Sequence, residues 1–400
     1  MSVDEIRSPI RSMRQPIFAV LVGLATFVVA CGRDQTRTSP VNDGGSEPSL
    51  VASARAAAGC RWLEREPPED AFLDPDCPAL KVWNEKFGTA TAKLYESELI
   101  DLLPAPERGV RWVAARGLTL VSQPQWRRDD TLARRVLARA TAETDPAVGH
   151  LVGELVGSIW IADDSLSTPQ FAEPVLAALR NGARPSVRAG VARKVLASNP
   201  KVPAVKAGLV DLARAPGPAL PRMAALDALA YQSTKDSSVD EPTCSLLLDA
   251  SRDPDARVSA NAATLIAGNN ALGGCPAKRE ALLTGLAEYP ALTPIHVAAL
   301  GRVAEVATSA LQKQAVAILR RIVETKDADS DLRKAALSTI GERDPDAKTF
   351  ASRFLYDDDV LLRLDAASIL GVDVPIGSPK DAGADASAKT ARPDGGARAK

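Results

Sequence analysis

The feature that most constrains the fold of this chain is a short pattern that recurs between residues 109 and 371. Each copy has an apolar or small residue, usually an arginine next, a small residue three to five positions later, and an aliphatic residue near position eight. Successive arginine positions are 38, 39, 34, 35, 39, 37 and 30 residues apart. A period of about 36 residues predicts stacked supersecondary units that share one extended core. The residues in this register are Arg111, Gly149, Arg188, Arg222, Arg257, His296, Arg333 and Arg363.

Each unit also carries a second apolar segment upstream of this pattern, as at 131–143 and 309–324. Aliphatic residues recur there at intervals of three and four, which places them on one face of a helix. Only 4% of the chain is aromatic although 46% is hydrophobic, so its apolar residues are mostly helix-favouring alanine and leucine, with valine. The sequence therefore predicts an all-α fold with two helices per unit. Capping residues before a first-turn proline mark helix starts at 145–146, 168–169, 253–254, 293–294 and 344–345.

The best copies, 329–341 and 359–371, closely follow the form D-x-x-V-R-x-x-A-x-x-x-L-G, and in this the chain resembles the HEAT-repeat family and its shorter bacterial variety. The resemblance covers 84–371 and implies a right-handed α-solenoid of about eight antiparallel helix pairs. Tetratricopeptide repeats are the rival, but they require recurring tryptophan and tyrosine. In the HEAT family the arginine belongs to a ladder with the aspartate of the preceding turn. The implied ladder residues are Arg111, Arg188, Arg222, Arg257, Arg333 and Arg363, with Asp331 placed for Arg333 and Asp359 for Arg363.

Three arginines near the N-terminus precede 14 uncharged residues, 17–30, a run shorter than the roughly 17–25 apolar residues of a transmembrane helix. In this order of a basic and a short apolar segment, residues 1–30 resemble a bacterial lipoprotein signal peptide. A buried N-terminal helix is the alternative. Residues 28–31, Val-Val-Ala-Cys, resemble a lipobox, which implies cleavage before Cys31 and attachment of fatty acyl groups such as palmitate there. Because Gly32 and not aspartate follows, the resemblance implies the outer membrane more than the inner one, with a periplasmic or surface-exposed body.

Composition divides the rest of the chain into four parts. Residues 31–53 are rich in Ser, Thr, Gly, Pro and charge, which predicts a flexible tether. Residues 54–83 fit no repeat and predict a cap, with two tryptophans shielding the apolar face of the first unit. The repeat domain follows at 84–371. Residues 372–400 contain almost no aliphatic side chains and predict a disordered tail.

Export would make the four remaining cysteines candidates for disulfides. In an oxidising compartment an even number of cysteines favours disulfide bonds, and four cysteines allow three pairings. The local pairs, Cys60 with Cys77 and Cys244 with Cys275, are the most economical, and free buried thiols are the alternative for the second pair. The sequence has neither a C-x-x-C motif nor a Cys/His cluster, so no zinc site is predicted.

Charge and motifs argue against several classes of function. The 49 basic and 50 acidic residues nearly balance, and a net charge of −1 disfavours a nucleic-acid partner. The sequence contains no P-loop, dinucleotide-binding glycine motif or nucleophile elbow, so no catalytic residue, cofactor or metal is predicted. His150, one helical turn before Glu154, is expected at a surface or groove. His296 stands at an arginine position, so a structural role is expected.

Three tryptophans, Trp112, Trp126 and Trp160, lie in the first two units. They either form a binding patch, since aromatic residues are enriched at interaction hot spots, or pack in the core and cap. Together these observations predict a membrane-anchored, non-catalytic scaffold that binds an unidentified protein or peptide through the α-solenoid surface. The alternatives are a HEAT-like enzyme or enzyme accessory of lyase type, and a structural component of the cell envelope.

Overall fold

The computed structural model describes residues 49–65, 68–87, 92–121, 124–163, 167–181, 184–232, 234–235, 238–269 and 272–374. The predicted signal peptide, Cys31 and most of the predicted tether and tail lie outside these residues. Within them the chain forms 18 α-helices and two short antiparallel hairpins, which confirms the predicted all-α fold. None of these helices combines the length and hydrophobicity that a membrane-spanning helix requires.

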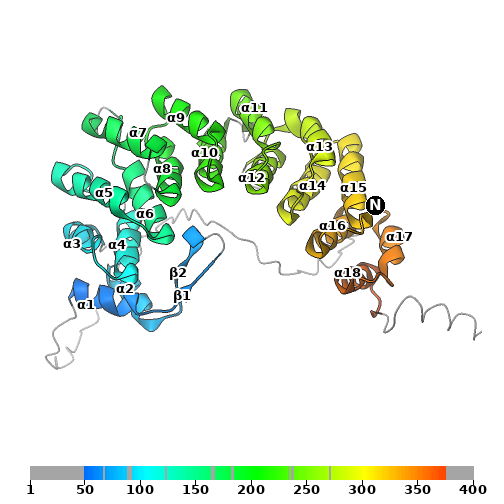
Figure 1. The fold of residues 1–400 in the computed structure, drawn as a ribbon, viewed down its shortest axis with the longest axis horizontal. Helices are drawn as coiled ribbons and strands as arrows, with labels where there is room; N and C mark the ends of the chain where they lie inside the picture. Colours follow the sequence, from blue (N-terminus) through cyan, green and yellow to red (C-terminus); the bar gives the residue numbers. More distant parts are fainter. Residues whose placement is uncertain are drawn as a thin grey trace, which may run out of the picture. The chain divides into compact units, whose positions relative to one another are not determined.

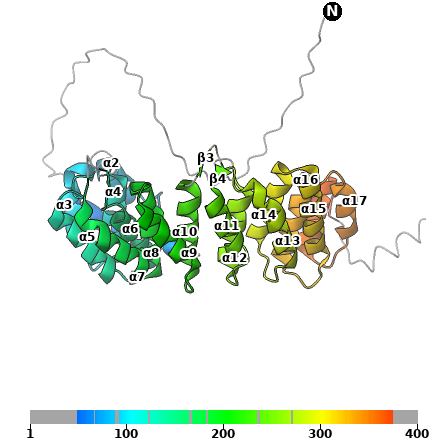
Figure 2. The ribbon, with the colours of Figure 1, turned by 90° about the horizontal axis from the view of Figure 1, so that it is seen from above.

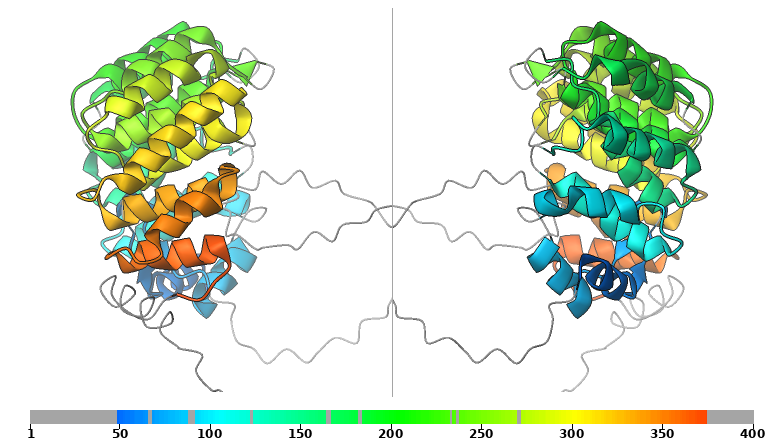
Figure 3. Two further views of the ribbon diagram at one scale, coloured as in Figure 1. Left: turned by 90° about the vertical axis from the view of Figure 1, so that its right-hand side faces the viewer. Right: turned by 90° about the vertical axis from the view of Figure 1, so that its left-hand side faces the viewer.

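The helices of the repeat region form two layers, which run side by side in Figure 1. The first helices are α3 (Glu96–Leu102), α5 (Asp130–Ala142), α7 (Ala172–Asn181), α9 (Pro203–Arg214), α11 (Glu241–Ala250), α13 (Arg279–Glu288), α15 (Ser309–Glu324) and α17 (Ala347–Ala351). The second helices are α4 (Arg108–Leu120), α6 (Pro146–Gly157), α8 (Pro185–Ser198), α10 (Ala219–Gln232), α12 (Ala256–Ala267), α14 (Pro294–Val306), α16 (Ser330–Arg343) and α18 (Val360–Leu370). Figures 2 and 3 show the same succession from above and from both ends.

The remaining elements lie before the repeats or join them. Short 3-10 turns precede or follow four first helices: η2 (Ala92–Tyr95), η3 (Pro169–Phe171), η4 (Pro276–Lys278) and η5 (Ser352–Phe354). A hairpin of β3 (Thr234–Lys235) and β4 (Ser238–Val239) joins α10 to α11. The N-terminal elements are α1 (Leu50–Ala58), β1 (Trp62–Leu63), η1 (Pro68–Asp70), β2 (Phe72–Leu73) and α2 (Pro78–Phe87).

Several helices begin where a side chain accepts a hydrogen bond from a free backbone N–H group. Six aspartates cap helices in this way: Asp129, Asp145, Asp240, Asp255, Asp329 and Asp359. At two of the predicted Asp-Pro starts, 253–254 and 344–345, the helix begins only at Ala256 and Ala347. Each of these aspartates instead accepts a hydrogen bond from the N–H two residues later, at 2.9 and 3.0 Å, which forms a turn before the helix.

Second helices pack more closely against one another than first helices do, and α6 and α8 form the closest pair. Glycines make this possible. A Cβ atom at Gly153 would lie 2.2 Å from the Val187 carbonyl oxygen, and one at Gly190 would lie 2.1 Å from the His150 carbonyl oxygen. The backbones of α6 and α8 are therefore in direct contact, which alanine-based packing alone does not allow.

The N-terminal helix α1 begins inside the segment predicted to be a tether. Ser49 Oγ accepts a hydrogen bond from the Ala52 N–H at 3.2 Å, and Leu50, Ala54 and Ala57 are buried on the side that packs against α4. The tether prediction is therefore wrong for residues 50–53. A serine cap followed by apolar residues at helical spacing outweighed the polar composition of the segment.

Two disulfides join Cys60 to Cys77 and Cys244 to Cys275, with Cα–Cα distances of 5.9 and 5.7 Å. These are the local pairs favoured by the sequence, and free thiols at the second pair are not what the structure contains. The first disulfide closes a loop that holds β1, η1 and β2. Closing a loop of this length stabilises a fold by about 3 kcal/mol through lost entropy of the unfolded chain.

Candidate binding pocket under the N-terminal hairpin

Several of the repeated arginines bind the carbonyl end of the first helix of their own unit, and some of these also bind an acidic residue of the next unit. Arg222 donates from Nε to the Ala213 carbonyl at the end of α9, at 3.2 Å, and forms an ion pair with Asp253 of the next unit. Arg333 donates from Nε to the Val323 carbonyl at the end of α15, at 3.0 Å. Arg188 makes the same bond to Leu179 at the end of α7, at 3.3 Å. The ladder therefore satisfies carbonyl groups that a helix end leaves free.

The acidic partners differ from those expected. Arg333 lies 3.4 and 3.7 Å from the carboxylates of Asp357 and Asp359 in the next unit, and no bond to Asp331 is found among the described residues. Residues two positions apart on a helix do not face each other, which explains why Asp331 does not reach it. Arg363 donates to the Asp357 carbonyl at 2.9 Å, while the Asp359 carboxylate caps α18 and accepts a hydrogen bond from Ser330.

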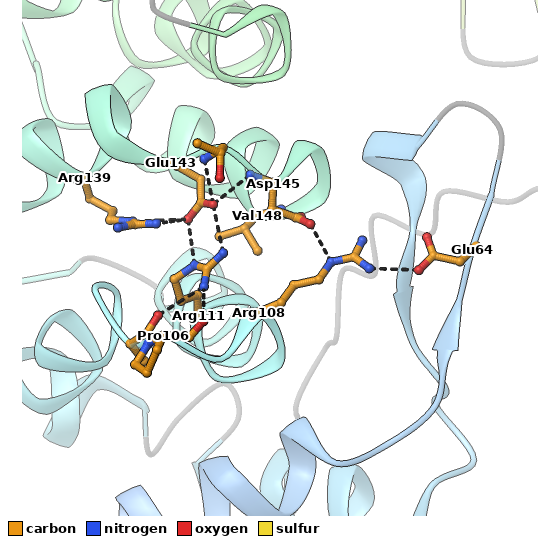
Figure 4. Close-up of polar contacts among 10 residues, drawn as sticks. Glu64, Pro106, Arg108, Arg111, Arg139, Glu143, Asp145 and Val148 are labelled. Atoms are coloured by element: carbon orange, nitrogen blue, oxygen red, sulfur yellow. Dashed lines mark hydrogen bonds and ion pairs between the residues drawn. The ribbon is translucent and has the colours of Figure 1, made fainter.

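Two further ladder arginines, Arg257 and Arg111, differ in how exposed they are and in which residues they bind. Arg257 is exposed and binds the carboxylate of Asp255, the cap of its own helix, with N–O distances of 2.9 and 3.2 Å. Arg111 is partly buried and donates to the Pro106 carbonyl and to Glu143, at 2.9 and 3.0 Å (Figure 4). Arg111, Arg222 and Arg333 therefore join two units, while the bonds of Arg257 stay within its own.

The three tryptophans do not form a surface patch. Trp126 is 1% exposed and Trp160 is 7% exposed, so both belong to the core. The backbone N–H of Trp126 donates a hydrogen bond to Glu96 Oε2 at 2.7 Å. Trp112 is half-buried, and its ring meets the Trp62 ring edge-on at 6.1 Å. The interpretation as a binding patch is therefore wrong, and the alternative of core packing holds for Trp126 and Trp160, while Trp112 lines a cavity.

That cavity lies between the N-terminal hairpin and helices α2, α4 and α6, and we call it the hairpin pocket. Its volume is about 480 Å³, within the usual range of ligand sites. The hairpin segment 69–75 forms one wall, and the helices provide the others. The helical lining includes Leu80 of α2, Trp112 and Arg116 of α4, and His150 and Leu151 of α6.

Several bonds hold the hairpin over the helices. Trp62 pairs with Leu73 across the two strands, and the Cys60–Cys77 disulfide closes the base of the loop. Arg108 of α4 donates from Nη1 to Glu64 Oε1 at 2.8 Å, and its Nε lies 2.6 Å from Asp145 Oδ2, at the start of α6 (Figure 4). The same guanidinium lies 3.5 Å from the centre of the Trp62 ring. The hairpin, α4 and α6 are thus joined at one residue.

A buried carboxylate fixes the start of α6. Glu143 accepts hydrogen bonds from Arg111, from Arg139 and from the Asp145 N–H, at 3.0, 3.2 and 2.9 Å (Figure 4). Burial by itself raises the pKa of Glu143, but these bonds outweigh it and the pKa is lowered. The charged carboxylate therefore holds α4, α5 and α6 in register, and with them the pocket wall.

His150 lies in this wall and is 7% exposed, so the expectation of a surface or groove residue is only partly correct. No group of the described residues hydrogen-bonds to its Nδ1 or Nε2 atoms. Nε2 lies 3.6 Å from Glu154 Oε1, and Arg193 Nη1 and Lys194 Nζ of α8 lie 3.7 and 3.9 Å from the same carboxylate. Burial raises the pKa of Glu154, but these neighbours lower it overall, so Glu154 is charged at neutral pH.

His296, the other histidine, lies at an arginine position of the repeat and is 0% exposed. Its Nδ1 accepts a hydrogen bond from the Thr293 N–H at 3.1 Å, so the hydrogen of the neutral ring is on Nε2. Nε2 donates to Ser259 Oγ at 3.0 Å, and Ser259 donates to the Ser251 carbonyl at 2.6 Å. Burial lowers the pKa of His296 to about 4. The ring therefore joins α12 to α14 as a neutral group.

A scan against protein-family models and a search of curated proteins both found no match. The resemblance to HEAT repeats therefore depends on the repeat pattern itself. Within the part of the chain that the structure describes, no group of three His, Cys, Asp or Glu side chains is placed to hold a metal ion.

Proposed function

We propose that this chain is a membrane-anchored, non-catalytic scaffold that binds a protein or peptide partner through its second helices. The body is taken as a HEAT-like, right-handed α-solenoid of about eight antiparallel pairs, from α3–α4 to α17–α18. The hairpin pocket is the observation that carries this proposal. It opens beside the second helices and combines apolar walls with polar groups, as binding sites do.

Side chains from successive second helices support an extended site beyond the pocket. The Asn261 amide of α12 donates to the Asp227 carboxylate of α10 at 3.1 Å, and Arg343 of α16 forms an ion pair with Glu305 of α14 at 3.3 Å. A smaller hollow of about 230 Å³ lies between α12 and α14. Polar groups that continue from unit to unit suit a partner that lies across several repeats.

The anchor is proposed from the N-terminal sequence. Residues 1–30 serve as a signal peptide, and Cys31 carries the lipid that places the body at the cell envelope, with Gly32 favouring the outer membrane over the inner one. The two disulfides support this location, because such bonds persist in oxidising compartments. Residues 31–48 then act as the tether between the lipid and α1.

Site-specific crosslinking in living cells tests the partner. A photoreactive benzoylphenylalanine replaces Leu151 of α6 or Met223 of α10, and matched control variants carry it at Glu280 of α13 or Lys313 of α15. We expect a specific adduct from the second-helix sites at least ten times stronger than from the first-helix sites. Equal adducts from both layers, or none from any site, would contradict the proposal.

Fatty-acid labelling tests the anchor separately. Cells grown with an alkyne fatty acid should label the natural chain and not the Cys31→Ser variant, which should also leave the membrane fraction. Label that persists in Cys31→Ser would refute lipidation at this residue, whatever the crosslinking shows.

A further inference from the structure

We propose that the hairpin pocket binds the side chain of a lysine or arginine of the partner between the carboxylates of η1 and His150, whose ring turns so that Nδ1 accepts a hydrogen bond from it. The inference rests on the proposed function, because it specifies which part of a peptide partner enters the pocket. It goes beyond that function by assigning the chemistry of the bound group.

The first argument is the unpartnered imidazole. Glu154 is charged and lies 3.6 Å from Nε2, so the hydrogen of a neutral His150 ring is favoured on Nε2, facing the carboxylate. Nδ1 is then left as a buried acceptor with no donor among the described residues. An unpaired buried acceptor of this kind costs about 1–3 kcal/mol. Nδ1 is enclosed in the present ring orientation, so a ligand that brings a donor recovers this cost once the ring turns Nδ1 toward the cavity.

The second argument is the charge at the pocket. Glu69 and Asp70 of η1 are two carboxylates in its lining, and Arg116 is one guanidinium. Arg257 also lies within electrostatic range of Glu69, but its guanidinium is bound by Asp255. Arg193 and Lys194 of α8 offset the charge of Glu154 next to His150, so the η1 side of the pocket, with Glu69 and Asp70, is the side that favours a cation. A ligand carboxylate would face two like charges and would bring no donor to Nδ1.

The third argument is the shape and type of the walls. Phe72, Leu73 and Leu80 form an apolar surface, along which the methylene stem of a basic side chain packs while its charged end reaches polar groups. Aromatic rings of this region already accept guanidinium groups: Arg108 lies 3.5 Å from the Trp62 ring centre, and Arg65 lies 4.6 Å from that of Phe72. Trp112 offers a further ring in the pocket lining.

Binding of short peptides tests the proposal. The probes are fluorescein-labelled Gly-Ser hexapeptides with one central residue, arginine, lysine, norleucine, tyrosine or glutamate. Fluorescence anisotropy with the detergent-solubilised full chain should give at least tenfold tighter binding for arginine and lysine than for the other three. A tyrosine or norleucine peptide that binds equally well, or no binding by any peptide at millimolar concentration, would overturn the assignment.

Variants place the binding in the pocket. His150→Leu should weaken the arginine peptide at least fivefold, and Glu69→Gln with Asp70→Asn should weaken it at least threefold. Glu280→Gln, on a first helix, is the matched control and should leave affinity unchanged. Thermal unfolding by circular dichroism verifies that each variant is folded. An unchanged affinity in folded His150→Leu would overturn the role of the imidazole.

A second signal separates this proposal from the proposed function. With 5-fluorotryptophan in the chain, the fluorine resonance that Trp112→Phe removes reports on the pocket. The arginine peptide should shift that resonance. If it does not, while crosslinking at Met223 still captures a partner, the assignment of the pocket fails and the scaffold function stands. If no second-helix site crosslinks to a partner, the function itself fails.

Discussion

The two histidines of the chain are both buried on second helices, yet their hydrogen bonding is opposite. Both ring nitrogens of His296 have partners, and the ring belongs to a chain of bonds from Thr293 to Ser251. Neither ring nitrogen of His150 has a hydrogen-bond partner among the described residues, and its ring lines a pocket. Burial therefore does not distinguish a structural histidine from a candidate binding residue. The state of its hydrogen bonds does.

The surroundings of the two histidines differ because glycines near His150 allow two helices to approach closely. Gly149, next to His150, is the one glycine in the arginine register of the repeat, and Gly153 and Gly190 let α6 and α8 touch. This contact brings Arg193 and Lys194 of α8 toward Glu154. The region of His150 is thus built by close backbone packing, and that of His296 by side-chain bonds.

The largest effect on the free energy of unfolding is expected from breaking the backbone contact between α6 and α8. In Gly153→Val the new side chain would begin 2.2 Å from the Val187 carbonyl oxygen, so α6 and α8 must separate. We expect a loss of about 4 kcal/mol or more in the free energy of unfolding, measured by urea denaturation. Gly285→Ala in α13 is the control. Its Cβ would lie 3.6 Å from the nearest atom of Arg252, so stability should rise by up to about 1 kcal/mol. Equal stability of the two variants would contradict the packing described.

The second largest effect on the free energy of unfolding is expected at His296, and the same substitution at His150 gives a direct comparison. His296→Leu leaves Ser259 and the Thr293 N–H without their partner, and we expect it to lower the free energy of unfolding by about 2–4 kcal/mol. His150→Leu removes an unpaired buried acceptor, which is a gain, and the contact with Glu154 at 3.6 Å, which is a loss, so the change should lie within about 1 kcal/mol of zero. Denaturant midpoints of the two variants, measured together, give the comparison. A larger loss in His150→Leu would reverse our interpretation of both residues.

The dependence of stability on pH sharpens the same contrast. The pKa of His296 is about 4 in the fold and 6.5 in the unfolded chain, so the unfolded chain binds the proton first. Its contribution is complete above pH 6.5 and falls as the pH drops toward 4, by up to about 3 kcal/mol. Unfolding free energies of the natural chain and His296→Leu between pH 4 and 7.5 should therefore converge toward low pH. A constant difference would show that the ring is not held neutral.

The repeat spacing predicted the all-α fold because every copy of the pattern places apolar residues at helical intervals, and the same helix packing recurs in each unit. The partners of the ladder arginines were missed, since Asp253 and Asp357 come from the following unit and a pattern within one unit does not contain that contact. The hairpin pocket was missed because segment 54–83 matches no repeat. One signal was present in the sequence. The glycine at position 149, where other units have arginine or histidine, marks the unit whose neighbour approaches most closely.

The smallest effect on stability is expected from a substitution of Glu64. This substitution tests whether the ion pair with Arg108 shapes the hairpin pocket without contributing to the stability of the fold. Glu64 is exposed and forms an ion pair with Arg108 at 2.8 Å, and such surface pairs contribute about 0–1 kcal/mol. Glu64→Gln should therefore leave the denaturant midpoint nearly unchanged.

Arg108 also contacts Trp62 and Asp145, so loss of the Glu64 bond frees one attachment of the hairpin to the helices. Affinity for the arginine hexapeptide should fall about twofold to threefold, because the hairpin wall is less well ordered before binding. The control is Glu324→Gln, which removes the exposed pair with Arg353 far along the repeat and should change neither quantity. Equal affinities of Glu64→Gln and Glu324→Gln would mean that the disulfide and the two strands alone hold the pocket in shape.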